Sequence, residues 1–167
     1  NLTATPNNGW VVGSWLGSNN DSSTATINTL TMPTSDHNVS VIYTQVCYRL
    51  TISHSGDGAN PIAVPSQSEG CAAGTYHAGD LINLTALPAT RYQLNHWSGT
   101  NDDSRSSDTN TLTMPANNHT LSVVYTQACY ALTLTHNGTG ADPMAAPTQS
   151  NGCAQSHYHY AENITLS

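Results

Sequence analysis

The chain has 167 residues, of which only 8% are charged, and its 3 Lys and Arg stand against 10 Asp and Glu. So few positive charges exclude a basic nucleic-acid-binding surface and a polybasic membrane anchor. Thr, Ser and Asn supply most of the polarity, a composition typical of secreted and surface proteins, and no apolar run is long enough to span a membrane. We therefore expect an extracellular or cell-surface protein with no nucleic-acid partner and no membrane insertion.

One internal repeat organises the whole sequence. When the chain is shifted by 82 positions, it aligns with itself without a gap, and 42 of the 85 comparable positions are identical. Residues 47–128 form one complete unit, residues 1–46 match its back part, and residues 129–167 match its front part. We expect the remaining parts of the outer units to come from a longer tandem chain or from a neighbouring subunit, so copies of the chain itself are the expected partners.

Strand patterns dominate from the first residue, and no stretch has helical periodicity. Alternation and turn residues predict short strands over 1–6, 10–16 and 30–32. A longer extended run over 39–53 contains neither Gly nor Pro and crosses the repeat boundary. Because flexible linkers are built from Gly and Ser, this run predicts a stiff connection between units.

The complete unit continues the same alternation. Tyr48, Leu50 and Ile52 alternate with polar residues, which predicts one buried face, and a loop rich in Gly and Pro follows over 55–70. Further strands are expected at these places: 71–77, 82–86, 92–97, 112–114 and 121–125. These make about six short strands per unit. The predicted fold class is all-β, with tandem small β-sheet or sandwich modules of about 82 residues that are stiffly connected.

The four cysteines occupy matched places, two in each copy of the repeat. An even, periodic set in a chain rich in Thr and Asn indicates disulfides and an oxidising compartment. The spacing favours the pairs Cys47–Cys71 and Cys129–Cys153, although bridges between units or between subunits stay open. Closing a loop of this length stabilises a fold by about 3–4 kcal/mol.

Six short motifs follow one another between Tyr48 and Pro115. They are Tyr-x-Leu-x-Ile, Gly-x-Gly-x-x-Pro, Tyr-x-Ala-Gly, Ile-x-Leu-Thr-Ala-x-Pro, Tyr-x-Leu-x-x-Trp-Ser-Gly and Leu-Thr-Met-Pro. This order resembles the divergent internalin-type B-repeat family, which occurs in tandem on large bacterial cell-surface proteins. The resemblance implies small β-rich extracellular modules that serve as stalks, spacers or adhesive arrays, without catalytic residues. The paired cysteines, the Tyr residues in place of Phe and the ends within a unit depart from that family and favour a specialised assembly.

Two residue patterns invite a metal site. Three histidines recur in both copies: His37, His54 and His77 match His119, His136 and His159. Zinc needs three or four convergent ligands, and no tight Cys/His spacing supplies them. The loops 19–22 and 101–104 offer oxygen ligands to calcium but lack the bidentate Glu and fixed Gly of a dedicated loop. We expect no metal and no other cofactor.

Glycans are a second class of candidate partner. Among the Asn-x-Ser/Thr sequons, the candidate glycosylation sites are Asn20, Asn38, Asn118 and Asn137. Trp15 and Trp97 each precede a Gly by two residues and could stack on a sugar, but their place in an alternating strand favours the core.

Catalysis finds no support in the sequence. No nucleophile-elbow motif is present, and the carboxylates lie in loops, so we expect no catalytic residues and no enzyme activity. Our first hypothesis is a structural subunit or segment of an extracellular filament or surface fibre, built from tandem β-rich repeats, completed by neighbouring copies and stabilised by disulfides. The alternative is an adhesin stalk or binding module that recognises a glycan or a protein receptor.

Overall fold

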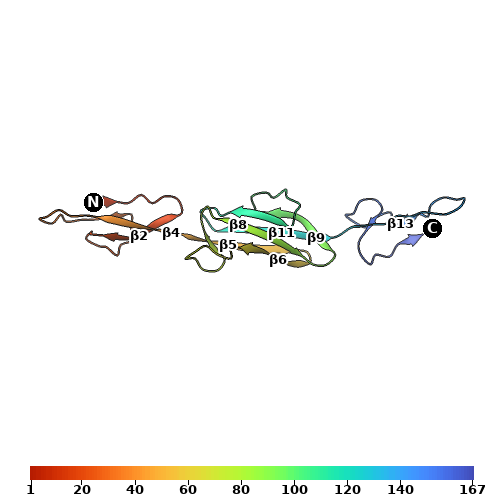
Figure 1. Ribbon diagram of the computed structural model, residues 1–167, viewed down its shortest axis with the longest axis horizontal. Helices are drawn as coiled ribbons and strands as arrows, with labels where there is room; N and C mark the ends of the chain where they lie inside the picture. The colour runs from red at the N-terminus through yellow and green to blue at the C-terminus, as the bar shows by residue number, and fades with distance from the viewer.

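The computed structural model describes all residues, 1–167, and shows three β-structured parts in a row (Figure 1). We call residues 1–46 the N-terminal part, residues 47–128 the middle unit and residues 129–167 the C-terminal part. All fifteen regular elements are strands, so the all-β prediction is confirmed, and no helix exists that could cross a membrane.

The middle unit contains seven strands in two sheets. In chain order they are β5 (Cys47–Ser55), β6 (Gly58–Val64), β7 (Thr75–His77), β8 (Leu81–Pro88), β9 (Tyr92–Ser98), β10 (Thr109–Thr113) and β11 (His119–Gln127). One sheet has the order β7-β5-β11-β9, and the other has the order β10-β8-β6. The first and last strands of the unit, β5 and β11, are parallel neighbours, whereas every other pair in the unit is antiparallel.

Twelve buried residues from both sheets form the core of the middle unit. The predicted alternation places Ile82 and Leu84 of β8 and Leu121 of β11 inside, each with at most 1% of its surface exposed. The hydroxyl of Tyr125 donates to the carbonyl of Ala59 at 2.9 Å and accepts from the amide of Leu87 at 2.8 Å. Since Tyr125 lies in one sheet and its partners lie in the other, this side chain ties the two sheets together.

The N-terminal part repeats the pairings of the second half of the middle unit. Its strands are β1 (Leu2–Thr3), β2 (Trp10–Leu16), β3 (Ile27–Asn28) and β4 (Ser40–Gln45), paired as β1-β3 and β2-β4. Trp15 lies opposite Val41, just as Trp97 lies opposite Val123. Its small core consists of Ala4, Val12 and Trp15.

The C-terminal part repeats the pairings of the first half. Its strands are β12 (Tyr130–Ala131), β13 (Ala145–Ala146), β14 (His157–Tyr158) and β15 (Thr165–Leu166), paired as β12-β14 and β13-β15. Tyr130 lies opposite Tyr158, just as Tyr48 lies opposite Tyr76. Each outer part therefore keeps only the pairings whose two strands it contains.

Four details of the strand prediction are wrong. No strand forms over 30–32, because the matching segment of β10 pairs with Leu81 and Ile82, whose repeat counterparts would precede Asn1. The strand expected over 1–6 is limited to Leu2–Thr3, and the one expected over 71–77 begins only at Thr75. Conversely, β6 lies within the predicted loop 55–70, since it pairs with β8 despite its Gly and Pro residues.

The connections between the parts are one or two residues long and are hydrogen-bonded. Only Val46 separates β4 from β5, and its amide donates to the carbonyl of Gly9 at 2.8 Å. At the second junction, the amide of Ala128 donates to the carbonyl of Arg91, also at 2.8 Å. The linking residue is thus hydrogen-bonded to the preceding part at both junctions, which restricts bending between the parts.

Candidate functional site: open strand edges

Two strands of the N-terminal part have one unpaired edge, whereas their counterparts in the middle unit are paired on both edges. In the middle unit, β11 pairs with β9 on one side and β5 on the other, whereas its counterpart β4 pairs only with β2. Likewise β8 pairs with both β10 and β6, but its counterpart β1 pairs only with β3. A free strand edge presents unpaired amides and carbonyls to any chain that can pair with it.

The C-terminal part lacks the opposite half of the same pairings. Its strands β12 and β13 are the counterparts of β5 and β6, and they pair only with β14 and β15. No strand in this part corresponds to β11 or β9. The two outer parts therefore present complementary edges, one lacking the strands that the other contains.

Side-chain exposure shows the cost of these missing neighbours. Met114 is 1% exposed in the middle unit, but its counterpart Met32 is 65% exposed. Leu84 is 1% exposed, and its counterpart Leu166 is 55% exposed. Burying such side chains is favourable by about 1.5–3 kcal/mol each, so the outer parts hold unused hydrophobic free energy.

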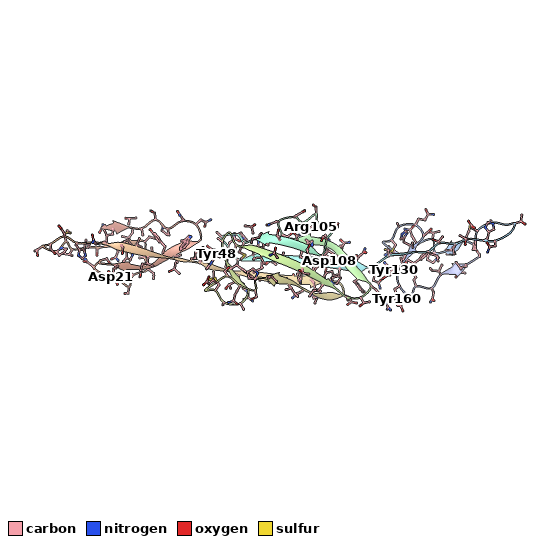
Figure 2. The ribbon with its side chains drawn as sticks, in the orientation of Figure 1. Asp21, Tyr48, Arg105, Asp108, Tyr130 and Tyr160 are labelled. Carbon is pink, nitrogen blue, oxygen red and sulfur yellow. A yellow bond between two sulfur atoms is a disulfide. The ribbon has the colours of Figure 1, made fainter.

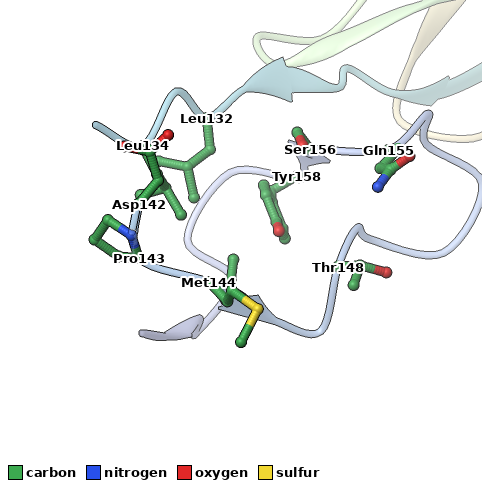
Figure 3. A pocket seen from close by; sticks show the side chains of 10 residues that line it. Leu132, Leu134, Asp142, Pro143, Met144, Thr148, Gln155, Ser156 and Tyr158 are labelled. Atoms are coloured by element: carbon green, nitrogen blue, oxygen red, sulfur yellow. The ribbon is translucent and has the colours of Figure 1, made fainter. Parts of the chain in front are cut away.

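Each outer part has a hollow lined partly by side chains whose counterparts pack in or against the core of the middle unit. In the C-terminal part, a hollow of about 380 Å³ is lined by Leu132, Leu134 and Tyr158 among others (Figure 3). Their counterparts in the middle unit pack in or against the hydrophobic core. In the N-terminal part, a hollow of about 230 Å³ is lined by Thr5, Asn7, Trp10 and Tyr43. The counterpart of Tyr43 is Tyr125, the residue that ties the two sheets together.

Two glycines of the C-terminal part have positive φ angles, although no neighbouring side chain in the chain packs against them. In the middle unit, Gly56 (φ +80°) and Gly58 (φ +157°) lie against Tyr125, and a Cβ on Gly58 would come within 2.6 Å of its ring. Their counterparts Gly138 (φ +90°) and Gly140 (φ +156°) have φ angles within 10° of these, but nothing lies within 4 Å of a Cβ there. The C-terminal part is therefore already shaped for a tyrosine that it does not contain.

Both disulfides lie within single copies of the repeat, in the pairing that the spacing favours. They join Cys47 to Cys71 and Cys129 to Cys153, each with a Cα–Cα distance of 5.8 Å. A histidine nitrogen, of His77 or His159, lies within 4.8 Å of the sulfurs. Since metals bind thiolates and these sulfurs are bridged, the Cys/His groups are not metal sites in this state.

The two candidate calcium loops use their carboxylates internally. Asp103 accepts hydrogen bonds from the amides of Thr100 and Gly99, and Asp21 accepts one from the amide of Ser18. The backbone hydrogen bonds from Thr100 and Ser18 are the main reason why the pKa of each carboxyl lies below its ordinary value of 3.8. These contacts close the loops and leave no cluster of free carboxylates.

Trp15 and Trp97 belong to the core. Trp97 is 1% and Trp15 5% exposed, and their indole N–H groups donate to the carbonyls of Ser107 and Ala25. A buried ring cannot stack on a sugar. The candidate glycosylation sites Asn20, Asn38, Asn118 and Asn137 are all exposed, and their glycosylation stays a prediction.

The residues that shape the open edges were not singled out by the sequence as a site. They include Tyr43, Gly138 and Gly140. Asn118, a candidate glycosylation site, lies in the middle unit, where its side-chain oxygen accepts from the amide of Arg49 at 2.8 Å. The repetition of Gly-x-Gly and of Tyr at fixed positions was a signal for the tyrosine and the glycines, but it did not indicate that these residues meet.

A comparison with known families gives one match. The model described as the divergent InlB B-repeat domain matches residues 1–47 and 60–129. Both segments end at a repeat boundary, since Cys47 and Cys129 are counterparts. No curated protein and no solved structure matches the chain.

Proposed function

The chain belongs to the divergent InlB B-repeat domain family, and we propose that it is a structural segment of an extracellular surface fibre built from tandem β units. One observation carries this proposal. The outer parts present complementary open edges, and the middle unit contains the pairing that would close both of them. Neighbouring copies complete the end units and continue the row of β units in both directions.

The shape of the chain supports a load-bearing or spacing role. The three parts lie in a row with the termini toward opposite ends (Figure 1). A single hydrogen-bonded residue connects β4 to β5, so there is no flexible tether between those parts. Such a row holds its ends apart, which a fibre or a stalk requires.

The chemistry of the chain supports an extracellular setting. One disulfide per repeat copy is typical of an oxidising compartment, and the low charge content leaves a surface of hydroxyls and amides. The disulfides strengthen units that bury only small cores. We therefore place the protein outside the cell or on its surface.

The adhesin alternative has less support. Trp15 and Trp97, the side chains that the sequence offers for stacking on a sugar, are buried and hydrogen-bonded within their own parts. We accordingly propose no catalytic and no receptor-binding residue.

Immunogold electron microscopy of intact cells that produce the protein tests the proposal. Antibodies against the purified chain should label extracellular fibres at regular axial intervals. The matched control is a serum raised against a cytoplasmic protein of the same cells, which should leave the fibres unlabelled. Label confined to the cell interior, or scattered on a surface without fibres, would rule the proposal out.

A further inference from the structure

We propose that a second copy of the chain closes the open edge of β4 in one fixed register, with Leu134 of one copy opposite Val39 of the other. This inference rests on the proposed function, because it specifies how neighbouring copies complete the end units. The template is the parallel pairing of β5 with β11, in which Ile52 lies opposite Leu121. Leu134 and Val39 are the repeat counterparts of these two residues.

The apolar surfaces available at this register fit each other. Val39 and Val41 are half-buried against the small core of the N-terminal part. Leu132 and Leu134 line the hollow of the C-terminal part. In the middle unit, the counterparts of all four side chains pack in or against one core. Bringing the two parts together would remove both sets of side chains from water at once.

A tyrosine that packs against two glycines fits only if the two copies pair in this register. Tyr125 lies against Gly56 and Gly58 and donates to the carbonyl of Ala59. By the same repeat positions, Tyr43 of one copy enters the open notch at Gly138 and Gly140 of the other and donates to the carbonyl of Ala141. Both sides are prepared for this contact, since the Tyr43 hydroxyl already accepts from the amide of Thr5 at 3.2 Å and the notch is empty.

The start of the parallel pair gains a charged acceptor. In the middle unit, the side-chain oxygen of Asn118 accepts from the amide of Arg49. The counterparts are Asp36 and Ala131, so the carboxylate of Asp36 takes the amide of Ala131 in the second copy. Hydrogen bonds to a carboxylate are stronger than those to a neutral amide oxygen, and the Asp36 side chain is exposed.

The strand beside β13 could be either residues 165–167 of the same copy or residues 1–3 of a second copy. Leu166 pairs with Ala145 within the C-terminal part, and Leu2 of a second copy occupies the same repeat position, that of Leu84. Leu2 already packs against the N-terminal core and is held by β3, whereas Leu166 is 55% exposed in a two-residue strand. Residues 1–3 of the second copy therefore replace residues 165–167 beside β13.

Sedimentation velocity of the full chain tests the register with two singly blocked variants. Val39→Asp blocks the N-terminal edge and leaves the C-terminal part intact, while Leu134→Asp does the reverse. The average mass of the wild type should rise with concentration, and each variant alone should need at least about tenfold more protein to associate. A mixture of the two variants should form a 1:1 dimer and stop there, because each dimer has both remaining edges blocked.

Four further variants test the individual contacts, and one of them is a control for general damage. Thr133→Asp changes the exposed residue beside Leu134 and should associate like the wild type. Gly140→Val should block association, because its side chain would meet the ring of Tyr43 and because the φ of +156° at Gly140 strains any side chain there. Leu2→Ser should weaken association, while the same change at Leu166 should leave it equal or stronger.

Several results would overturn the inference. They are a wild type that stays monomeric up to millimolar concentration, a mixture of blocked variants that forms no dimer, and a Leu166→Ser chain weakened as much as Leu2→Ser. A monomeric chain on cells with labelled fibres would mean that further repeats of the same polypeptide fill the edges. That outcome removes the second copy as the occupant but leaves the proposed fibre function standing.

Discussion

The guanidinium carbon of Arg91 lies 3.2 Å from the centre of the Tyr160 ring, across the junction between the middle unit and the C-terminal part. Figure 2 shows Tyr160 at this junction. The counterparts at the first junction are Gly9 and Ala78, where a Cβ on Gly9 would lie 3.1 Å from that of Ala78. The same two repeat positions therefore meet at both junctions. At the first junction they are two small residues, Gly9 and Ala78, and at the second they are a cation and an aromatic ring, Arg91 and Tyr160.

Removing the guanidinium should loosen the second junction without unfolding the middle unit. The Arg91→Ala variant loses an exposed cation–π contact of about 0.5–1 kcal/mol. The amide of Ala128, which is bonded to the carbonyl of Arg91, should then exchange its hydrogen faster, as measured by NMR. Core amides should keep their rates, and Arg105→Ala in an exposed loop should change neither set. Unchanged exchange at Ala128 would show that the ring contact does not hold the junction.

The two disulfides should differ in what they stabilise. Replacing Cys47 and Cys71 together by Ala should lower the stability of the middle unit by about 3 kcal/mol, because the cross-link restricts the unfolded chain. Replacing Cys129 and Cys153 should loosen the C-terminal part and leave the main unfolding transition in place. Urea denaturation followed by tryptophan fluorescence separates these outcomes. Equal loss in both variants would mean that the three parts unfold as one unit.

One substitution at two matched positions measures how complete each core is. Trp97→Phe leaves the Ser107 carbonyl without its indole partner and opens space in a filled core, at a cost of about 1–3 kcal/mol. Trp15→Phe removes the same bond from a core of only three buried residues. Its effect on the main thermal transition should be small. A larger effect at Trp15 would show that the N-terminal part is coupled to the middle unit.

Acid should open the loop that Asp103 closes. Hydrogen bonds, first among them the one from the amide of Thr100, hold the pKa of Asp103 below 3.8. A carboxyl whose folded pKa is lowered stabilises the fold above its unfolded pKa, and this contribution is lost as the pH falls through the folded pKa. The Thr100 amide signal should therefore shift on titration from about pH 5 to pH 2, and Asp103→Asn should abolish most of that shift. A shift of equal size in the variant would assign the effect to another group.

The repeat made many local contacts predictable once one copy was understood. The ring nitrogen of His37 bonds to Gly17, as that of His119 bonds to Gly99, and the paired cysteines join as their spacing favours. Alternation also identified buried faces, because side chains in a strand point to opposite sides of the sheet.

The neighbours of each strand could not be predicted in the same way. Alternation defines which face of β5 is buried. It does not indicate that β5 pairs with β11, the last strand of the unit and far from β5 in sequence. For the same reason the strand expected at Leu30 was wrong, since a strand needs a partner as well as a pattern. The notch at Gly138 and Gly140 is recognisable only when the filled and the empty copies are compared in space.

The parallel pairing of β5 and β11 also determines how the middle unit carries mechanical force. Tension along the row enters at the start of β5 and leaves at the end of β11, so it pulls these adjacent strands past each other. Their hydrogen bonds run across the direction of pull and share the load, instead of opening one after another. If β5 and β11 separate, the disulfide between Cys47 and Cys71 prevents the segment between these two cysteines from being extended.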